Sequence, residues 1–371
     1  MVNKLKIVVF GHKIIPSRSG GVEIAAAQLA IRMAAQGHDV TCYNRGGGKE
    51  AFYKGICLKP TPTIPGKGLS AVSSSFFAAL AAVFSRADIC HIHAEGPALM
   101  SFLPKLAGKR VIVTVHGLDW QREKWRGSIG SAYIRMGEKM AVRFADKIIV
   151  LNRHTQAYFR QRYGRETCFI PNGVEIPRIL PPNLISEQFG LQKDGYILYL
   201  GRLVPEKGIH DLIRTFRELP TQKRLVIAGA SSDTAAYAAH LHNLAAGDPR
   251  ILFTGFVEGQ LLEELYSNAF LYVLPSHLEG MPLGLLEAMS YGNCCLISNI
   301  PGCTDAAGGH ALTFPAGDTA ALLDTLQQVC MDEALRQKYR SNARNHVRDR
   351  FNWDEITRKT LELYDENSTD S

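Results

Sequence analysis

Residues 196–218 read YILYLGRLVPEKGIHDLIRTFRE, and this stretch indicates the fold class. Tyr196 to Leu200 is a short apolar run typical of a buried strand, and glycines and a proline follow it as a loop. From Ile209 to Glu218, apolar residues recur at helical spacing. A strand, a loop and a helix in this order predict a parallel sheet that is covered by helices.

The same alternation extends in both directions from this stretch. Apolar runs predict strands at 6–10, 40–44, 89–93, 111–115, 148–151, 225–228, 251–253, 271–275 and 295–298. Helical patterns lie between them at 22–36, 70–86, 129–144, 235–246, 261–269 and 283–291. We therefore predict an α/β protein with two doubly wound, Rossmann-like domains.

A proline-rich segment divides the two sets of elements. Residues 170–183, IPNGVEIPRILPPN, hold four prolines and are incompatible with a helix interior or a central strand. We expect domains at 1–175 and 191–350, a linker at 176–190, and a helix with a tail at 351–371. Two such domains are expected to face a central cleft, with ligands at the carboxyl ends of the strands.

The amino-acid composition is that of a soluble globular protein without disulfide motifs or membrane spans. The 371 residues are 46% hydrophobic and 21% charged, which is typical of a soluble globular protein. The eight cysteines are scattered without a C-x-x-C pair, and no run is long enough for a membrane span. We expect a cytoplasmic protein.

Charge differs strongly between the two halves. Residues 1–180 carry 26 Lys and Arg against 11 Asp and Glu, whereas the remaining residues carry 16 against 24. The basic half contains an amphipathic pattern at 129–147 with Arg135, Lys139, Arg143 and Lys147. Contact with an anionic membrane surface explains this pattern, and so does core packing with a solvated basic face. No nucleic-acid-binding motif is visible.

Arg202 and Lys207 follow the strand at 196–200 and emerge together at its carboxyl end. A guanidinium and an ammonium that converge on one place neutralise the charge of a diphosphate without a metal. The alternative is two solvated surface cations.

The segment PSHLEGMPLGLLEAMSYGN at 275–293 holds two carboxylates. Pro282 marks the first residue of a helix, so Glu279 belongs to the preceding loop and Glu287 to the second helical turn. Around this helix start, Gly280, Met281 and Leu283 offer backbone N–H groups to an anion or a sugar hydroxyl, whereas Pro282 has none. Glu287 suits the two hydroxyls of a ribose, and Glu279 those of a hexose. The alternative is a capping acid and a solvated helix face.

Two places in the first domain are further candidates. His116 follows the strand at 111–115, where a neutral imidazole binds a hydroxyl or transfers a proton. Gly20 and Gly21 precede a helix and suit an anion or a simple turn equally well.

His91 and His93 share a strand face but lack a third ligand, so we expect no metal there. Trp120 is either a sugar platform or part of the core.

Six motifs together resemble glycosyltransferase family 4, whose members have the GT-B fold. They are GGVE at 20–23, VHG at 115–117, PNGV at 171–174, GRLVPEKG at 201–208, GFV at 255–257 and EGMPLGLLEAMSYG at 279–292. The 116–125 segment HGLDWQREKW is similar to the bacterial polysaccharide-assembly subgroup of rhamnosyl- and galactosyltransferases. The resemblance implies that the final helix, around Trp353, crosses back to the first domain.

The family resemblance also implies roles for single residues. Arg202 and Lys207 would hold the diphosphate of a nucleotide sugar donor, Glu287 the ribose, and Phe256 and Val257 the base. Glu279 and His116 would bind the donor sugar, and Gly20 with Gly21 would close over the phosphates.

The implied reaction is metal-independent transfer of a hexose, with retention at the anomeric carbon, to a saccharide or lipid-linked acceptor in cell-surface polysaccharide synthesis. The donor is a substrate, and no resident cofactor is expected. A nucleotide-sugar epimerase of the same fold and a non-catalytic protein bound at a membrane surface remain alternatives.

Overall fold

The computed structural model describes residues 4–46, 48–66, 68–125, 127–231 and 234–365. The chain forms two compact units. Met1–Asn172 and Trp353–Ser371 make up the first unit, and Gly173–Asn352 makes up the second. Each unit contains one sheet, as the sequence predicts.

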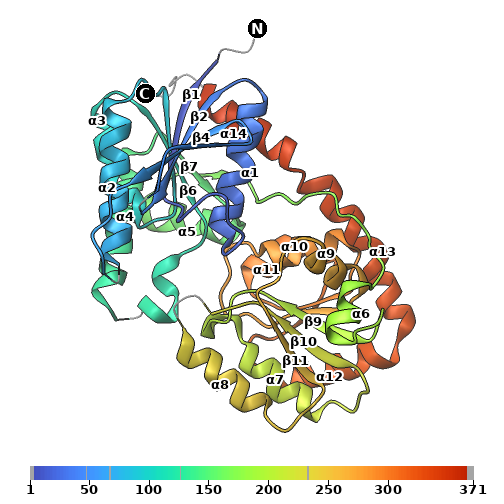
Figure 1. The fold of residues 1–371 in the computed structure, drawn as a ribbon. Coiled ribbons are helices and arrows are strands. Elements are labelled where there is room, and N and C mark those ends of the chain that lie inside the picture. Colours follow the sequence, from blue (N-terminus) through green and yellow to red (C-terminus); the bar gives the residue numbers. More distant parts are fainter. Residues whose placement is uncertain (1–3, 47, 67, 126, 232–233, 366–371) are drawn as a thin grey trace. The chain divides into compact units, whose positions relative to one another are not determined.

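The first unit is built on an eight-stranded sheet with the order β3-β4-β2-β1-β5-β6-β7-β8 (Figure 1). All its neighbouring strands are parallel except β3 and β4. The strands are β1 Lys6–Phe10, β2 Asp39–Arg45, β3 Ala51–Tyr53, β4 Ile56–Thr61, β5 Ile89–His93, β6 Arg110–Val115, β7 Lys147–Val150 and β8 Cys168–Phe169. The antiparallel hairpin β3–β4 was not predicted.

Helices lie on both faces of this sheet, with α2, α3 and α4 on one face and α1 and α14 on the other (Figure 1). The α-helices are α1 Gly21–Ala35, α2 Leu69–Phe84, α3 Phe102–Leu106, α4 Ile129–Phe144, α5 Arg153–Tyr163 and α14 Trp353–Asp365. Three short 3-10 helices are η1 Pro97–Ser101, η2 Asp119–Gln121 and η3 Glu123–Trp125. Alanines 78, 79, 82 and 141 let α2 and α4 pack closely on the sheet.

The last helix, α14, belongs to the first unit, as the family resemblance implies. Asp354 at its start pairs with Arg32 of α1 at 2.9 Å. Near its end, the buried Tyr364 hydroxyl lies 2.6 Å from His91 Nδ1 on β5. These contacts join the carboxyl terminus to the first sheet.

The second unit has a fully parallel six-stranded sheet with the order β11-β10-β9-β12-β13-β14. Its strands are β9 Tyr196–Leu200, β10 Arg224–Ala228, β11 Ile251–Gly255, β12 Leu271–Leu274, β13 Cys295–Ser298 and β14 Leu312–Phe314. The order reverses between β9 and β12. In open α/β sheets, ligands bind outside the carboxyl ends of the strands at such a reversal.

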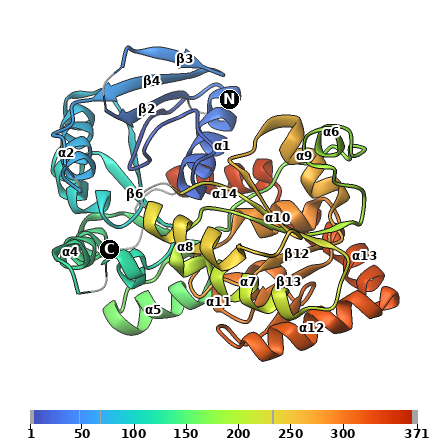
Figure 2. The same cartoon turned by 60° about the horizontal axis from the view of Figure 1, so that its bottom comes forward.

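Helices of the second unit also form two layers, with α7, α8 and α12 on one face and α9, α10 and α11 on the other. Figure 2 shows α10 against β12 and β13. The helices are α6 Leu184–Phe189, η4 Pro205–Lys207, α7 Ile209–Glu218, α8 Ala235–Ala245, α9 Gly259–Asn268, α10 Leu283–Ser290, α11 Pro301–Ala307, α12 Thr319–Met331 and α13 Glu333–Arg350. The helix α6 lies in the segment that we expected to be a linker.

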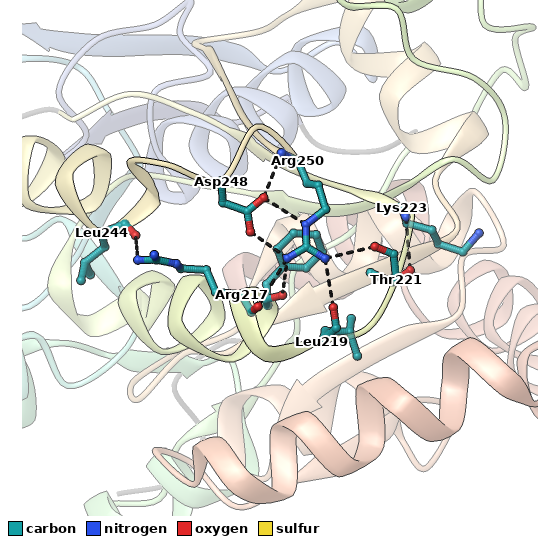
Figure 3. A network of polar contacts seen from close by, with 8 residues as sticks. Arg217, Leu219, Thr221, Lys223, Leu244, Asp248 and Arg250 are labelled. Carbon is teal, nitrogen blue, oxygen red and sulfur yellow. Dashed lines mark hydrogen bonds and ion pairs between the residues drawn. The ribbon is translucent and has the colours of Figure 1, made fainter.

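A guanidinium caps the carboxyl end of α7 (Figure 3). Arg250 Nη1 donates to the carbonyls of Leu219 and Thr221 at 3.0 Å each. Its Nε and Nη2 bind the Asp248 carboxylate at 3.0 and 2.7 Å. Leu219 and Thr221 come before β10, and Asp248 and Arg250 come before β11. The network therefore lies at the amino end of the sheet, opposite the edge where ligands are expected.

Two details of the predicted helices are wrong. Helix α10 begins at Leu283 with Pro282 as its N-cap, so Pro282 stands one residue before the helix. The helix predicted at 129–144 is confirmed as α4, but the amphipathic pattern at 129–147 extends past its end, because Ala145 is extended and Lys147 begins β7. Among the helices of the described residues, none has the length and apolar character that a membrane crossing requires.

Candidate active site

The candidate site of the second unit begins at a close contact between two loops. Gly208 ends the loop after β9 with φ at +65°, and a Cβ there would lie 2.0 Å from the Pro275 carbonyl oxygen after β12. Glycine is required here because a side chain would push the loops apart. The contact brings Lys207 and the segment after Pro275 together.

Lys207 Nζ forms an ion pair with Glu279 Oε1. The two side chains are 16% and 9% exposed, so water is largely excluded from the pair. Ser276 Oγ donates to the same carboxylate oxygen at 2.8 Å. The ion pair joins residues 72 positions apart in the sequence, at the point where the strand order reverses.

A second glycine contact fixes the backbone around Glu279. A Cβ on Gly302 of α11 would lie 2.3 Å from the Glu279 carbonyl oxygen and 2.7 Å from that of Gly280. The loop therefore packs directly on α11. The buried side chains of Met281 and Leu283 anchor the following helix start.

Glu287 is held separately from the Lys207–Glu279 pair. The buried Tyr266 of α9 donates its hydroxyl to Glu287 Oε2 at 3.1 Å. A Cβ on Gly284, one turn earlier, would lie 2.9 Å from the Tyr272 hydroxyl, which itself bonds Leu200 O at 3.3 Å. Tyr266 thus holds the Glu287 carboxylate, while Tyr272 joins the first turn of α10, at Gly284, to the end of β9.

The remaining predicted residues of this unit lie at the same edge of the sheet. Arg202 is half-buried, and its carbonyl accepts the Tyr199 hydroxyl at 3.1 Å. Gly229 joins the ends of three strands, because its N–H bonds Gly255 O at 2.8 Å and a Cβ on it would meet Gly201 O at 1.9 Å. Beyond Gly255, Phe256 is 52% exposed and Val257 is buried.

In the first unit, His116 follows β6 and lies against His93, with Nε2 2.9 Å from His93 Nδ1. Burial lowers the pKa of His116 to about 4 and that of His93 well below its usual value. Both rings are therefore neutral near pH 7. A neutral His116 suits hydrogen bonding to a hydroxyl.

Gly20 is the N-cap of α1, and Gly21 is its first residue. The Glu23 carboxylate lies at this helix start: Oε1 accepts from Lys13 N at 2.9 Å, and a Cβ on Gly20 would lie 2.4 Å from Oε2. An anion bound there would meet this negative charge.

Sequence reasoning missed two buried acids in the first unit. Glu138 of α4 accepts from Trp120 Nε1 at 3.2 Å and from Tyr158 OH at 2.8 Å, so Trp120 belongs to a buried polar network. Glu95 follows β5, and burial followed by the charges of Asp119 and Glu138 raises its pKa well above the usual value. Its position directly after a predicted strand was a signal that could have identified it.

Other missed residues lie near the predicted ones. Ser276 precedes Glu279 by three residues, whereas only the tertiary structure brings Tyr266 to Glu287. His91 and His93 stack and bond protein groups, including Thr114. Among the residues that the structure describes, a metal-compatible group occurs instead at His210, Asp211 and His277.

Two family models match most of the chain between them. The model described as Glycosyltransferase Family 4 matches residues 19–178, and that described as Glycosyl transferases group 1 matches residues 183–346. The chain belongs to glycosyltransferase family 4. Its two parallel-sheet units are those of the GT-B fold.

The relatives with similar sequences are named as glycosyltransferases too. An uncharacterized glycosyltransferase of Methanocaldococcus jannaschii is 30% identical over 47% of this chain and 46% of its own length. The O-antigen chain mannosyltransferase B of Escherichia coli is 27% identical over 48% of each chain. The match thus spans about half the length of these two relatives.

Solved structures share the fold. Sucrose-phosphate synthase from Thermosynechococcus elongatus superposes with a TM-score of 0.83 at 22% identity, over 97% of this chain and 98% of that one. HepE of Anabaena, in complex with UDP-glucose, gives a TM-score of 0.80 at 18% identity, over 96% and 98%.

Proposed function

We propose that this family 4 enzyme transfers a hexose from a nucleotide diphosphate sugar to a saccharide or lipid-linked acceptor in cell-surface polysaccharide synthesis, with retention at the anomeric carbon. The observation that carries the proposal is the largely buried Lys207–Glu279 pair at the strand-order reversal of the second unit. The mannosyltransferase relative and the UDP-glucose-bound structural neighbour support the choice of substrates.

In this proposal, Lys207 and Arg202 hold the donor diphosphate. The Glu279 carboxylate balances the Lys207 charge before the donor binds, which lowers the cost of keeping an ammonium in a site with little water. When the sugar–phosphate bond breaks, negative charge develops on the leaving diphosphate. Cations fixed in advance stabilise that charge, and no metal is required for this role.

The other predicted residues orient the donor. Glu287, held by Tyr266, accepts hydrogen bonds from the ribose, and Phe256 and Val257 contact the base. Glu279 and the neutral His116 bind sugar hydroxyls. Gly280, Met281, Pro282 and Leu283 line the helix start near the phosphates. The same role for Gly20 and Gly21 requires the Glu23 carboxylate to turn away from the start of α1.

The chemical step proposed is departure of the diphosphate from the face that the acceptor attacks. The sugar–phosphate C–O bond breaks, the acceptor oxygen bonds to the anomeric carbon on the same face, and a diphosphate oxygen takes the acceptor's proton. No enzyme nucleophile and no resident cofactor take part.

The first test screens donors and then determines the stereochemistry of transfer. Thermal unfolding is measured with a panel of nucleotide diphosphate sugars, because a donor at about 100 times its Kd adds about 2.7 kcal/mol of stability. Proton NMR of the product then gives the anomeric configuration. Retention is expected; inversion contradicts the mechanism, and consumption of the donor without an acceptor indicates an epimerase instead.

We further propose that the reaction takes place in the cytoplasm at the inner face of the membrane, through the exposed Arg135, Lys139 and Arg143 of α4. Met136 of the same helix is 49% exposed and adds an apolar side chain to this surface. Flotation with anionic and neutral vesicles tests this, and equal recovery with both contradicts it.

A further inference from the structure

Three side chains of the second unit gather beside the Lys207–Glu279 pair. His210 and Asp211 lie in the first turn of α7, and His277 follows β12. One potential ligand atom from each lies within 4.8 Å of the other two. Two imidazoles and one carboxylate are a ligand set typical of zinc sites.

The distances suit a single ion. His277 Nε2 lies 2.9 Å from Asp211 Oδ2, and His210 Nε2 lies 3.5 Å from Asp211 Oδ1. Ligand atoms around one tetrahedral zinc lie roughly 3.3 Å apart, given metal–ligand bonds of about 2.0–2.1 Å. The two distances run to different oxygens of Asp211, and one ligand atom from each residue lies within 4.8 Å of the other two, so side-chain rotation has to bring the three donors closer around an ion.

A neighbouring hydroxyl orients one ligand. Tyr237 OH lies 2.8 Å from His210 Nδ1, the ring nitrogen that faces away from Asp211. When Nδ1–H donates to the phenol oxygen, the lone pair is on Nε2, where a metal needs it.

The backbone holds the two sides of the cluster together without a metal. His277 N donates to Glu206 O at 2.9 Å, and the Gly208–Pro275 contact lies between the two chain segments. His277 is 39% exposed, which leaves room for a water as a fourth ligand. The cluster is thus largely formed in advance and open on one side.

We propose that His210, Asp211 and His277 bind one divalent cation of the zinc class, with water in the fourth position. The bound ion clamps the start of α7 to the loop after β12. The same two segments carry Lys207 and Glu279, so the ion rigidifies the backbone beneath that pair. This binding site does not depend on the proposed transferase reaction.

The test uses Co²⁺ as a spectroscopic probe on the untagged full-length chain. One equivalent of Co²⁺ is expected to give the visible absorption of a four-coordinate ion with N/O ligands, and Zn²⁺ is expected to displace it. His277→Ala and His210→Ala should each weaken binding at least 10-fold, whereas His154→Ala, at an exposed histidine of the first unit, should not change it.

Tyr237→Phe separates metal binding from a general structural effect. It keeps the ring but removes the hydroxyl, and a loss of affinity of about 10-fold is expected. Zn²⁺ should raise the Tm of the wild type and of His154→Ala, but not that of His277→Ala. A thiolate charge-transfer band, no Co²⁺ binding, or equal binding by all variants would overturn the proposal.

Discussion

Two cation–carboxylate pairs lie at opposite ends of the second sheet. They differ in how many hydrogen-bond donors of the cation already have a protein acceptor. At the amino end, Arg250 donates to Asp248 and to several carbonyls near the end of α7. At the carboxyl end, the Lys207 ammonium carries three donors, and its hydrogen bond to a described residue is to Glu279.

The difference separates a structural role from a ligand-binding one. A guanidinium whose donors are occupied by backbone carbonyls stabilises the fold and has little left for a ligand. An ammonium held by one carboxylate is positioned but retains donors for a diphosphate. The following predictions test this contrast.

The largest expected effect is on catalysis at Lys207. Lys207→Ala should lower kcat/KM about 10²–10³-fold, or about 3–4 kcal/mol, because charge on the leaving diphosphate loses its fixed cation. The unfolding free energy should change by about 1 kcal/mol, since Ser276 still donates to Glu279. Steady-state kinetics and urea unfolding measure the two quantities.

Lys193→Ala is the matched control for this variant, because Lys193 is an exposed lysine of the same unit. It should keep wild-type kinetics. Normal turnover by well-folded Lys207→Ala would remove Lys207 from the diphosphate site.

Arg250→Met should show the reverse pattern. The unfolding free energy is expected to fall by about 2–3 kcal/mol, because the Asp248 carboxylate and the carbonyls at the end of α7 lose charged donors. The kcat/KM of the folded enzyme should stay unchanged. Arg217→Met, which removes one bond to Leu244 O, should cost less than about 1 kcal/mol. Equal losses for the two variants would contradict a capping role for Arg250.

Glu287→Ala should mainly weaken donor binding. A roughly 10-fold rise in donor Kd, about 1.4 kcal/mol, is expected with a smaller change in kcat. Tyr266→Phe should give a smaller effect of the same kind, because it removes the hydroxyl that orients Glu287. Calorimetric titration with the donor measures both, and a loss confined to kcat would argue against a ribose contact.

The last prediction concerns pH and His116 of the first unit, whose charge differs little between the folded and the unfolded chain at neutral pH. His116 has a folded-state pKa of about 4, below the unfolded value of about 6.5, so between these values the unfolded chain binds a proton that the folded chain does not. Stability contributed by this group is therefore present above pH 6.5 and is lost as the pH falls toward 4.

Urea unfolding at pH 7 and pH 5 tests this linkage. His116→Gln should lose about 2 kcal/mol less than the wild type between the two pH values. An unchanged pH dependence would show that His116 does not stay neutral in the folded protein.

Local sequence patterns predicted most elements but not all. The strand at Tyr196–Leu200 and the helix at Ile209–Glu218 match the prediction residue for residue, because apolar spacing and flanking glycines mark their limits. The helix α6 was missed because four prolines in the adjoining segment dominated the interpretation. The hairpin β3–β4 was missed because its first strand, Ala51–Tyr53, has only three residues, which is too short for a strand pattern to show.

The site residues, too, could be predicted only where a local sequence pattern marks them. Motifs predicted Lys207, Glu279 and Glu287 as site residues, because charged residues directly after parallel strands or in the first turns of the following helix converge at one sheet edge. No local pattern identified Tyr266 or the cluster at His210, Asp211 and His277, because their partners lie on other elements.

The sequence by itself determined the alternation of strands and helices, the glycines that allow close loop contacts, and membership in the glycosyltransferase family. These are local properties, set by side-chain size, apolar periodicity and backbone freedom. Tertiary structure decided that Lys207 pairs with Glu279, that Arg250 caps a helix, and that burial keeps His116 neutral. Pairing and dielectric environment depend on residues far away in the sequence, so they are fixed only when the chain folds.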